Sequence, residues 1–184
     1  MEVTKILALD PSTDITGVVL ADCWQGDIVV TDWTEICAKS EDTSLESRIQ
    51  RIAYTRRTLE AWARQKLPVG TDYIVAYEYH LMRGGPASEA LSMAAGAYLT
   101  LFEGREIIPV YPSEAKAAWG GGRYKRDEAK RAVVVWANRF HGLELSPKQD
   151  GVADAAAVAE AAWGKWKKTQ ALTRQPSLFG GKLR

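Results

Sequence analysis

Four acidic side chains lie at the ends of segments that are otherwise apolar. Asp10 follows the run Ile-Leu-Ala-Leu, and Glu78 lies near the end of the segment Tyr-Ile-Val-Ala-Tyr-Glu-Tyr. Asp150 and Asp154 are four residues apart at the start of an Ala- and Val-rich stretch, so they share one face of a helix. Carboxylates packed together repel one another, and a hard divalent cation such as Mg²⁺ removes that repulsion. The four acids therefore predict a divalent-metal site, provided that the fold brings them together.

Each of these acids also has an ordinary structural explanation. Asp10 can open a β-turn, and Glu78 can face water on an edge strand. Asp150 can cap the last helix, and Asp154 is favoured in a first helical turn by the helix dipole. These explanations stay open for each residue taken alone. A shared cation accounts for all four acids at once.

The apolar pattern around the acids predicts a mixed α/β fold. Three short apolar segments joined by tight turns indicate an antiparallel meander of strands at 4–9, 17–21 and 27–35. Apolar residues then recur at helical spacing from Leu45 until Pro68-Val69-Gly70 ends the helix. The later segments predict strands at 73–79 and 107–110, and helices at 86–102, 113–119, 126–140 and 150–167. We expect one five-stranded mixed sheet, with its first three strands antiparallel and with helices on both faces.

Composition indicates one folded domain of ordinary size. The chain has 184 residues, of which 46% are hydrophobic and 26% charged, and its formal net charge is +1. That balance excludes a disordered chain, although no acidic residue follows Glu160. Two cysteines without metal-ligand spacing predict neither a disulfide framework nor a zinc site, which suits a reducing cytoplasm. We find no segment with the pattern of a signal peptide or a membrane span, and we expect no membrane partner. We assign residues 1–168 to the domain and residues 169–184 to a flexible basic tail.

The motifs occur in the order found in one known family. Asp10 closes an apolar strand, Pro11-Ser12 follows it, and Thr16-Gly17 opens the next strand. Further along come Tyr-Glu-Tyr-His around Glu78, an Ala-rich helix, and Ala-Asp-Ala-Ala-Ala-Val around Asp154. Over residues 4–166 the chain resembles a RuvC-type Holliday-junction resolvase of the ribonuclease-H-like superfamily. The resemblance implies that residues 1–168 form a ribonuclease-H-like nuclease domain.

The resemblance implies a Mg²⁺-dependent endonuclease that resolves four-way DNA junctions by paired symmetric nicks. Asp10 resembles the ligand that bridges two Mg²⁺ ions. Glu78 resembles the strand ligand, and Asp154 resembles the last ligand on the final helix. Mn²⁺ is expected to substitute for Mg²⁺. The family places another acid or a histidine three residues before that last ligand. This chain has Gly151 there, so Asp150 is expected to take its place. The implied two-metal hydrolysis leaves a 5′-phosphate and a 3′-hydroxyl.

The resemblance also assigns basic and aromatic residues to the DNA. Lys116 matches a basic position of the family and is expected to stabilise charge on the phosphorus. Leu81 stands where several relatives carry an aromatic residue that stacks at the junction centre, and Tyr79 is its expected replacement. His80 shares a strand face with Glu78, and a supporting or surface role is expected for it. The expected DNA contacts are Lys116, Arg123, Lys125, Arg126, Arg83 and Tyr79.

Two symmetric cuts need two active sites, so a homodimer with two-fold symmetry is the expected assembly. The Ala-rich helix that carries residues 88–101 is expected to supply part of the dimer face. In the tail, Gln175-Pro176-Ser177-Leu178-Phe179 resembles the pentapeptide that binds the bacterial sliding clamp, with Gln175, Leu178 and Phe179 as its anchors. A compact enzyme with such a tail suits a phage gene expressed in a bacterial cytoplasm.

Two other functions fit parts of the pattern. A ribonuclease-H-like domain can bind nucleic acid without cutting it, or can act on other branched or RNA-containing substrates. The segment Asp-Pro-Ser-Thr-Asp-Ile-Thr-Gly also resembles the first phosphate loop of actin-like ATPases and sugar kinases. That third function requires a duplicated domain and an adenosine-binding segment, and 184 residues accommodate neither.

Overall fold

The computed structural model describes residues 4–80 and 85–174, apart from the side chains of residues 126, 173 and 174. A five-stranded sheet has the order β3-β2-β1-β4-β5. The strand β1 (Thr4–Asp10) pairs antiparallel with β2 (Ile15–Trp24), which pairs antiparallel with β3 (Asp27–Cys37). On its other side β1 runs parallel to β4 (Tyr73–Glu78), which runs parallel to β5 (Ile107–Val110). The predicted mixed sheet, with its first three strands antiparallel, is confirmed.

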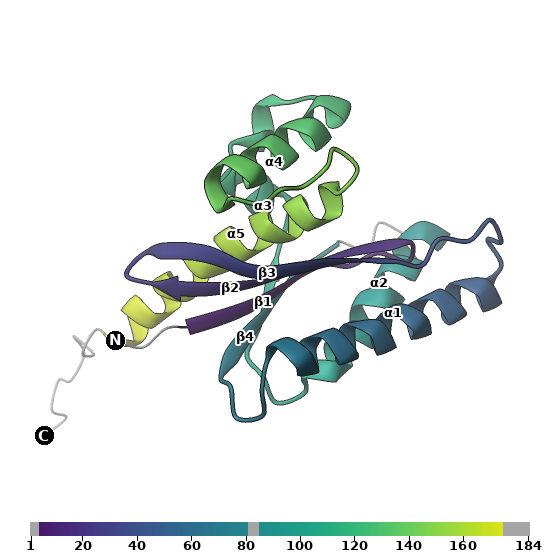
Figure 1. Ribbon diagram of the computed structural model, residues 1–184, viewed down its shortest axis with the longest axis horizontal. Helices are drawn as coiled ribbons and strands as arrows, with labels where there is room; N and C mark the ends of the chain where they lie inside the picture. The colour runs from purple at the N-terminus through teal and green to yellow at the C-terminus, as the bar shows by residue number, and fades with distance from the viewer. Residues whose placement is uncertain (1–3, 81–84, 175–184) are drawn as a thin grey trace, which may run out of the picture.

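Helices cover both faces of this sheet, as predicted (Figure 1). The helices α1 (Leu45–Lys66) and α2 (Pro86–Leu99) pack on one face. The helices α3 (Pro112–Ala118), α4 (Arg126–His141) and α5 (Asp150–Arg174) form the layer on the other face. Single turns of 3₁₀ helix follow α2 at Thr100–Phe102 and α3 at Gly121–Arg123.

The central strand divides its side chains between two hydrophobic cores. Ile6 and Ala8 of β1 face α5, whereas Leu7 and Leu9 face α1 and α2, and all four are fully buried. This alternation follows from the two-residue period of a strand. A strand buried on both faces is a continuous apolar run, which explains why Asp10 stands out at its end.

The last helix extends further than the sequence pattern predicts. We expected a helix at 150–167 followed by a flexible tail from residue 169, but α5 continues to Arg174. The rings of Trp163 and Trp166 stack 5.1 Å apart, and the Lys167 ammonium lies 5.3 Å above the Trp163 ring and donates to Gly26 O. These contacts hold the helix against the β2–β3 turn, so the next residues continue it. The tail pentapeptide, residues 175–179, lies outside the described residues.

One close backbone approach sets the position of α5. A Cβ atom on Gly17 would lie 2.0 Å from the carbonyl oxygen of Gly151 and 2.7 Å from the nitrogen of Val152. Only a residue without a side chain fits there, because the first turn of α5 lies directly on β2. In the described part of the chain, every helix is too short or too polar to cross a membrane.

Candidate active site

Three elements bring acidic side chains to one end of the sheet. Asp10 ends β1 and Glu78 ends β4. Because β1 and β4 are parallel neighbours, with Leu9 opposite Tyr77, their last residues lie side by side. The helix α5 begins above this edge, so Asp150 and Asp154 in its first turns add their charges to the same place. Open α/β sheets place their sites at such carboxyl ends of strands.

The strand residues form the tightest group of potential ligands. Oxygen atoms of Asp10 and Glu78 and a ring nitrogen of His80 all lie within 4.8 Å of one another. The His80 Nε2 atom is 3.9 Å from the Glu78 Oε2 atom. Two carboxylates and an imidazole at this separation can share one divalent cation.

The acids of this cluster raise one another's proton affinity. Burial raises the pKa of Asp10 well above its ordinary 3.8, and the charges of Glu78, Asp154 and Asp150 add to the effect. Burial also raises the pKa of Asp154 from 3.8 to about 7, with further contributions from Glu78 and Asp150. Lys130 and Lys116 act in the opposite direction on Asp154. The cluster therefore carries more negative charge than its surroundings neutralise.

A divalent-metal site requires excess negative charge and suitable donor atoms, and these residues have both. All donors are carboxylate oxygens or an imidazole nitrogen, which suit Mg²⁺ or Mn²⁺. Asp10, Glu78, His80 and Asp154 would hold the cation, since the first three converge within reach and Asp154 is coupled to two of them. A cation there would remove the repulsion that raises these pKa values.

Asp150 lies beside the cluster but has a partner of its own. Its Oδ2 atom accepts a hydrogen bond of 2.6 Å from the Lys130 ammonium of α4. At the next position, a Cβ atom on Gly151 would lie 3.7 Å from Asp10 Oδ2 and 3.6 Å from the Gly17 nitrogen. Position 151, which holds a ligand in the family that the chain resembles, therefore borders the cluster of acids. Glycine offers no ligand atom from a side chain at this position.

The residues assigned to DNA occupy different surroundings. Lys116 on α3 is close enough to lower the proton affinity of Asp154. The ring of Tyr79 is packed edge-on between those of Tyr77, at 6.2 Å, and Tyr111, at 5.5 Å. Arg123 and Lys125 are exposed around the start of α4. Arg83 and the side chain of Arg126 lie outside the described residues.

Comparison with known proteins agrees with this geometry. No protein-family model matches the chain. A curated relative, crossover junction endodeoxyribonuclease RuvC of Nocardia farcinica, is 25% identical over 158 residues, which are 84% of this chain and 78% of that protein. Thermus thermophilus RuvC, solved with a Holliday junction substrate, superposes with a TM-score of 0.65 at 20% identity, over 90% of this chain and 98% of that one. The chain is similar to RuvC in sequence and in fold.

A viral structure extends the similarity. The Fowlpox virus resolvase, solved with Holliday junction DNA, matches 89% of the RuvC-like chain and 99% of its own length, with a TM-score of 0.55 at 11% identity. At that identity the match shows only that the two folds are alike. The expected five-stranded mixed sheet with helices on both faces is confirmed, and it matches the fold of RuvC.

Two residues next to the acids were not among the ligands expected from the sequence. His80 was expected in a supporting or surface role, but its ring lies within ligand distance of Asp10 and Glu78. Glu35 on β3 pairs with Gly17 across the sheet, and its Oε2 atom is buried without a hydrogen-bond partner beside the charge of Asp150. The two-residue alternation along β4, continued to His80, places the His80 ring on the same face as Glu78. Placing Glu35 near the acids required the register of β2 against β3.

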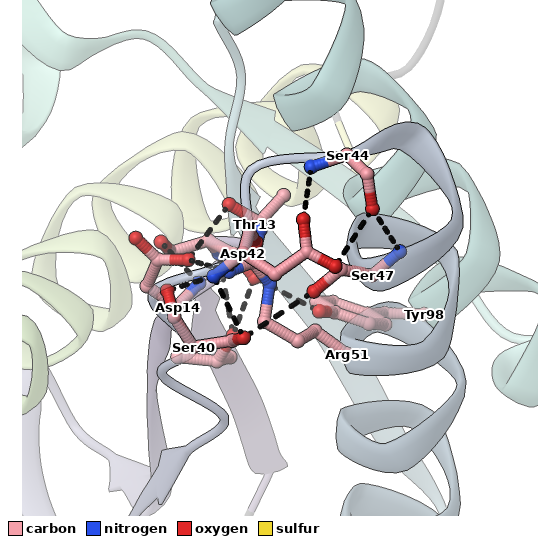
Figure 2. Close-up of polar contacts among 10 residues, drawn as sticks. Thr13, Asp14, Ser40, Asp42, Ser44, Ser47, Arg51 and Tyr98 are labelled. Carbon is pink, nitrogen blue, oxygen red and sulfur yellow. Dashed lines mark hydrogen bonds and ion pairs between the residues drawn. The ribbon is translucent and has the colours of Figure 1, made fainter.

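A polar network holds the turn between Asp10 and Gly17 (Figure 2). The buried Tyr98 hydroxyl of α2 donates to Ser12 O over 2.9 Å, and Thr16 Oγ1 donates to the same oxygen over 3.1 Å. The buried Arg51 of α1 lies 3.6 Å from Asp14 Oδ1 and donates to Ser40 O and Asp42 O. Both helices of one face thus fix the turn that follows Asp10.

Proposed function

We propose that this chain is a divalent-metal-dependent endonuclease that resolves four-way DNA junctions. The observation that carries the proposal is the convergence of Asp10, Glu78 and Asp154 from two strands and a helix onto one charged point. The RuvC-like sequence and fold supply the substrate class, since the solved relatives were crystallised with Holliday junctions.

The chain's own residues perform distinct tasks in this reaction. When bound, Mg²⁺ supplies the Lewis acidity that polarises a phosphodiester and activates water. Asp10, Glu78 and Asp154 would hold the metal, and Asp150 or His80 would complete the set of ligands. Lys116, whose charge already reaches Asp154, is placed to stabilise the negative charge that develops on the phosphate. The products are a 5′-phosphate and a 3′-hydroxyl.

A cleavage assay on synthetic junction, flap and plain duplex DNA tests the proposal. With Mg²⁺ or Mn²⁺, the junction should be nicked in two symmetric strands, and the duplex should stay intact. Asp10→Asn should lower cleavage by at least about a thousandfold and leave junction affinity within about twofold, because the amide removes a ligand charge but keeps the shape. Binding without cleavage by the wild-type chain would favour a non-cleaving nucleic-acid-binding function. Preference for flaps or RNA-containing substrates would favour the other alternative.

Paired cuts on a two-fold symmetric junction require two copies of this site. We infer a homodimer in which α2 contributes to the contact. Its outer surface presents the exposed Met93 and Gly96, and a cavity of about 250 Å³ between α2 and the end of β4 adjoins them. A side chain from a second copy can enter that cavity. The clamp-binding function of Gln175, Leu178 and Phe179 stays a prediction.

A further inference from the structure

A groove beside α3 and α4 is lined by none of the four clustered acids. It has a volume of about 540 Å³ and runs between one face of α4 and the segment that leads from α3 into α4. Ala132, Val135 and Arg139 contribute from α4, and Trp119 and Tyr124 contribute from the opposite wall. Val135 is 65% exposed and Phe140, at the end of the groove, is 66% exposed. Large apolar side chains in such a position indicate a contact surface.

Its aromatic rings are paired with arginines. The Trp119 and Tyr124 rings stack 5.7 Å apart at 19°, and the Arg123 guanidinium lies 5.1 Å from the Tyr124 ring centre. At the other end, the Arg139 guanidinium lies 5.6 Å from the Phe140 ring centre, which is 6.4 Å from that of Trp136. Each end of the groove therefore combines a flat apolar surface with a fixed positive charge.

The charges of the groove favour an anionic occupant. Arg123 and Arg139 are exposed at its two ends. The acid that lines it, Glu160, has its Oε1 atom 3.7 Å from Nε2 of the buried His141 side chain. The chain's own tail has Arg174, Lys182 and Arg184 and no acidic residue, so its charge opposes entry into this groove.

The groove lies on the face of α4 that is turned away from the cluster of acids. Lys130 binds Asp150 over 2.6 Å, whereas Ala132, Val135 and Arg139 of the groove lie about half a helical turn around α4 from Lys130. Along the groove face, α4 rises about 10 Å from Ala132 to Arg139, which is enough for a short length of polynucleotide.

We propose that this groove binds unpaired nucleotides of single-stranded DNA. The bases stack on Phe140 and on the Tyr124–Trp119 pair, and the phosphates lie against Arg139 and Arg123. Aromatic surfaces of this kind accept any base, because every base offers a π face. The groove therefore adds a single-strand-binding site to the chain, whatever duplex or junction its acid cluster acts on.

Direct binding of an oligothymidylate of about twelve nucleotides, followed by fluorescence anisotropy, tests the groove without any cleavage step. Phe140→Ala and Arg139→Ala should each weaken binding by about tenfold, whereas Phe140→Trp should preserve it. The matched controls are Tyr54→Ala and Arg57→Ala, exposed residues of α1 on the opposite face of the sheet, and they should change affinity by less than about twofold. Asp10→Asn should also leave this affinity unchanged, which separates the groove from the proposed catalytic site.

An abasic oligonucleotide of the same length isolates the stacking contribution. It should bind the wild-type chain about tenfold more weakly than oligothymidylate, and Phe140→Ala should weaken it no further. The proposal would be overturned if Phe140→Ala weakened the binding of both oligonucleotides equally. It would also be overturned if the α1 control substitutions weakened binding as much as Phe140→Ala does. Two other results would also overturn it: dissociation of a dimer by Phe140→Ala, or binding that requires deletion of residues 175–184. The first would assign the groove to a second copy of the chain, and the second would assign it to the tail.

Discussion

At the scale of single residues, the negative charge of the acid cluster determines how its stability depends on pH. Asp154 has a pKa of about 7 because burial and the charges of Glu78 and Asp150 oppose its ionisation. Its folded pKa lies above its unfolded value of 3.8, so its contribution to the free energy of unfolding is complete below about pH 4 and is lost as pH rises through about 7. The metal-free protein therefore folds with a penalty at neutral pH, which a bound cation removes.

We predict that Mg²⁺ affinity decreases as pH falls through about 7, since a proton on Asp154 competes with the cation. In EDTA, the free energy of unfolding should fall by about 4 kcal/mol between about pH 4 and pH 8 from this residue, as measured by urea denaturation. Asp154→Asn should remove that part of the pH dependence. If the variant showed the same dependence of stability on pH as the wild type, Asp154 would not lie in the buried, negatively charged environment described above.

Gly151 offers a second test at this scale. Its Cβ position would be 3.7 Å from Asp10 Oδ2 and makes only ordinary contacts, so a side chain fits there. We predict that Gly151→Asp lowers the dissociation constant for Mn²⁺ by about tenfold, because it adds a carboxylate to the donor set. The control is Gly164→Asp, which adds the same charge to α5 where no atom lies within 4 Å. Calorimetric titration that finds equal affinities for the two variants would exclude residue 151 from the cluster.

At the scale of elements, the contact between β2 and α5 places the helical acids over the strand acids. A Cβ on Gly17 would collide with the backbone of Gly151 and Val152, which cannot rotate away as a side chain can. We predict that Gly17→Ala lowers the free energy of unfolding by roughly 3 kcal/mol and also weakens Mn²⁺ binding, because the helix start must shift. The expected fall in melting temperature is roughly 6–12 °C.

The same substitution elsewhere in α5 controls for the loss of a glycine. Gly164→Ala meets no atom within 4 Å and should be neutral or stabilising by up to about 1 kcal/mol, since alanine favours a helix. If Gly17→Ala melted at the wild-type temperature, the close approach would not be what holds α5 on the sheet.

At the scale of the whole molecule, the proposed four-way junction substrate has two-fold symmetry, and this symmetry sets the expected assembly. We predict a dimer at micromolar concentration, measured by sedimentation equilibrium. Met93→Glu should raise its dissociation constant by at least about tenfold, because an unpaired charge would be buried at the α2 contact. Ile49→Glu on α1 is the control, since Met93 is 46% exposed and Ile49 is 49% exposed. A wild-type chain that sediments only as a monomer would refute the dimer.

Much of the fold followed from the sequence because its signals are local. The buried run before Asp10, the two-residue alternation of the strands and the stripes of the helices predicted the sheet and the layers correctly. Where prediction failed, distant contacts decided. The end of α5 depends on Lys167, which donates to Gly26 O in the β2–β3 turn, and no window along the chain contains that contact.

The sequence by itself determined which side chains are available, namely acids at the ends of apolar segments and a glycine where a strand meets a helix. Only the tertiary structure decided which of them meet. The parallel register of β1 and β4 draws His80 toward Asp10 and Glu78, and the ion pair with Lys130 holds Asp150 from α4. The cause is geometric, because contacts between residues far apart in the chain depend on strand order and helix position, which the chain adopts as a whole.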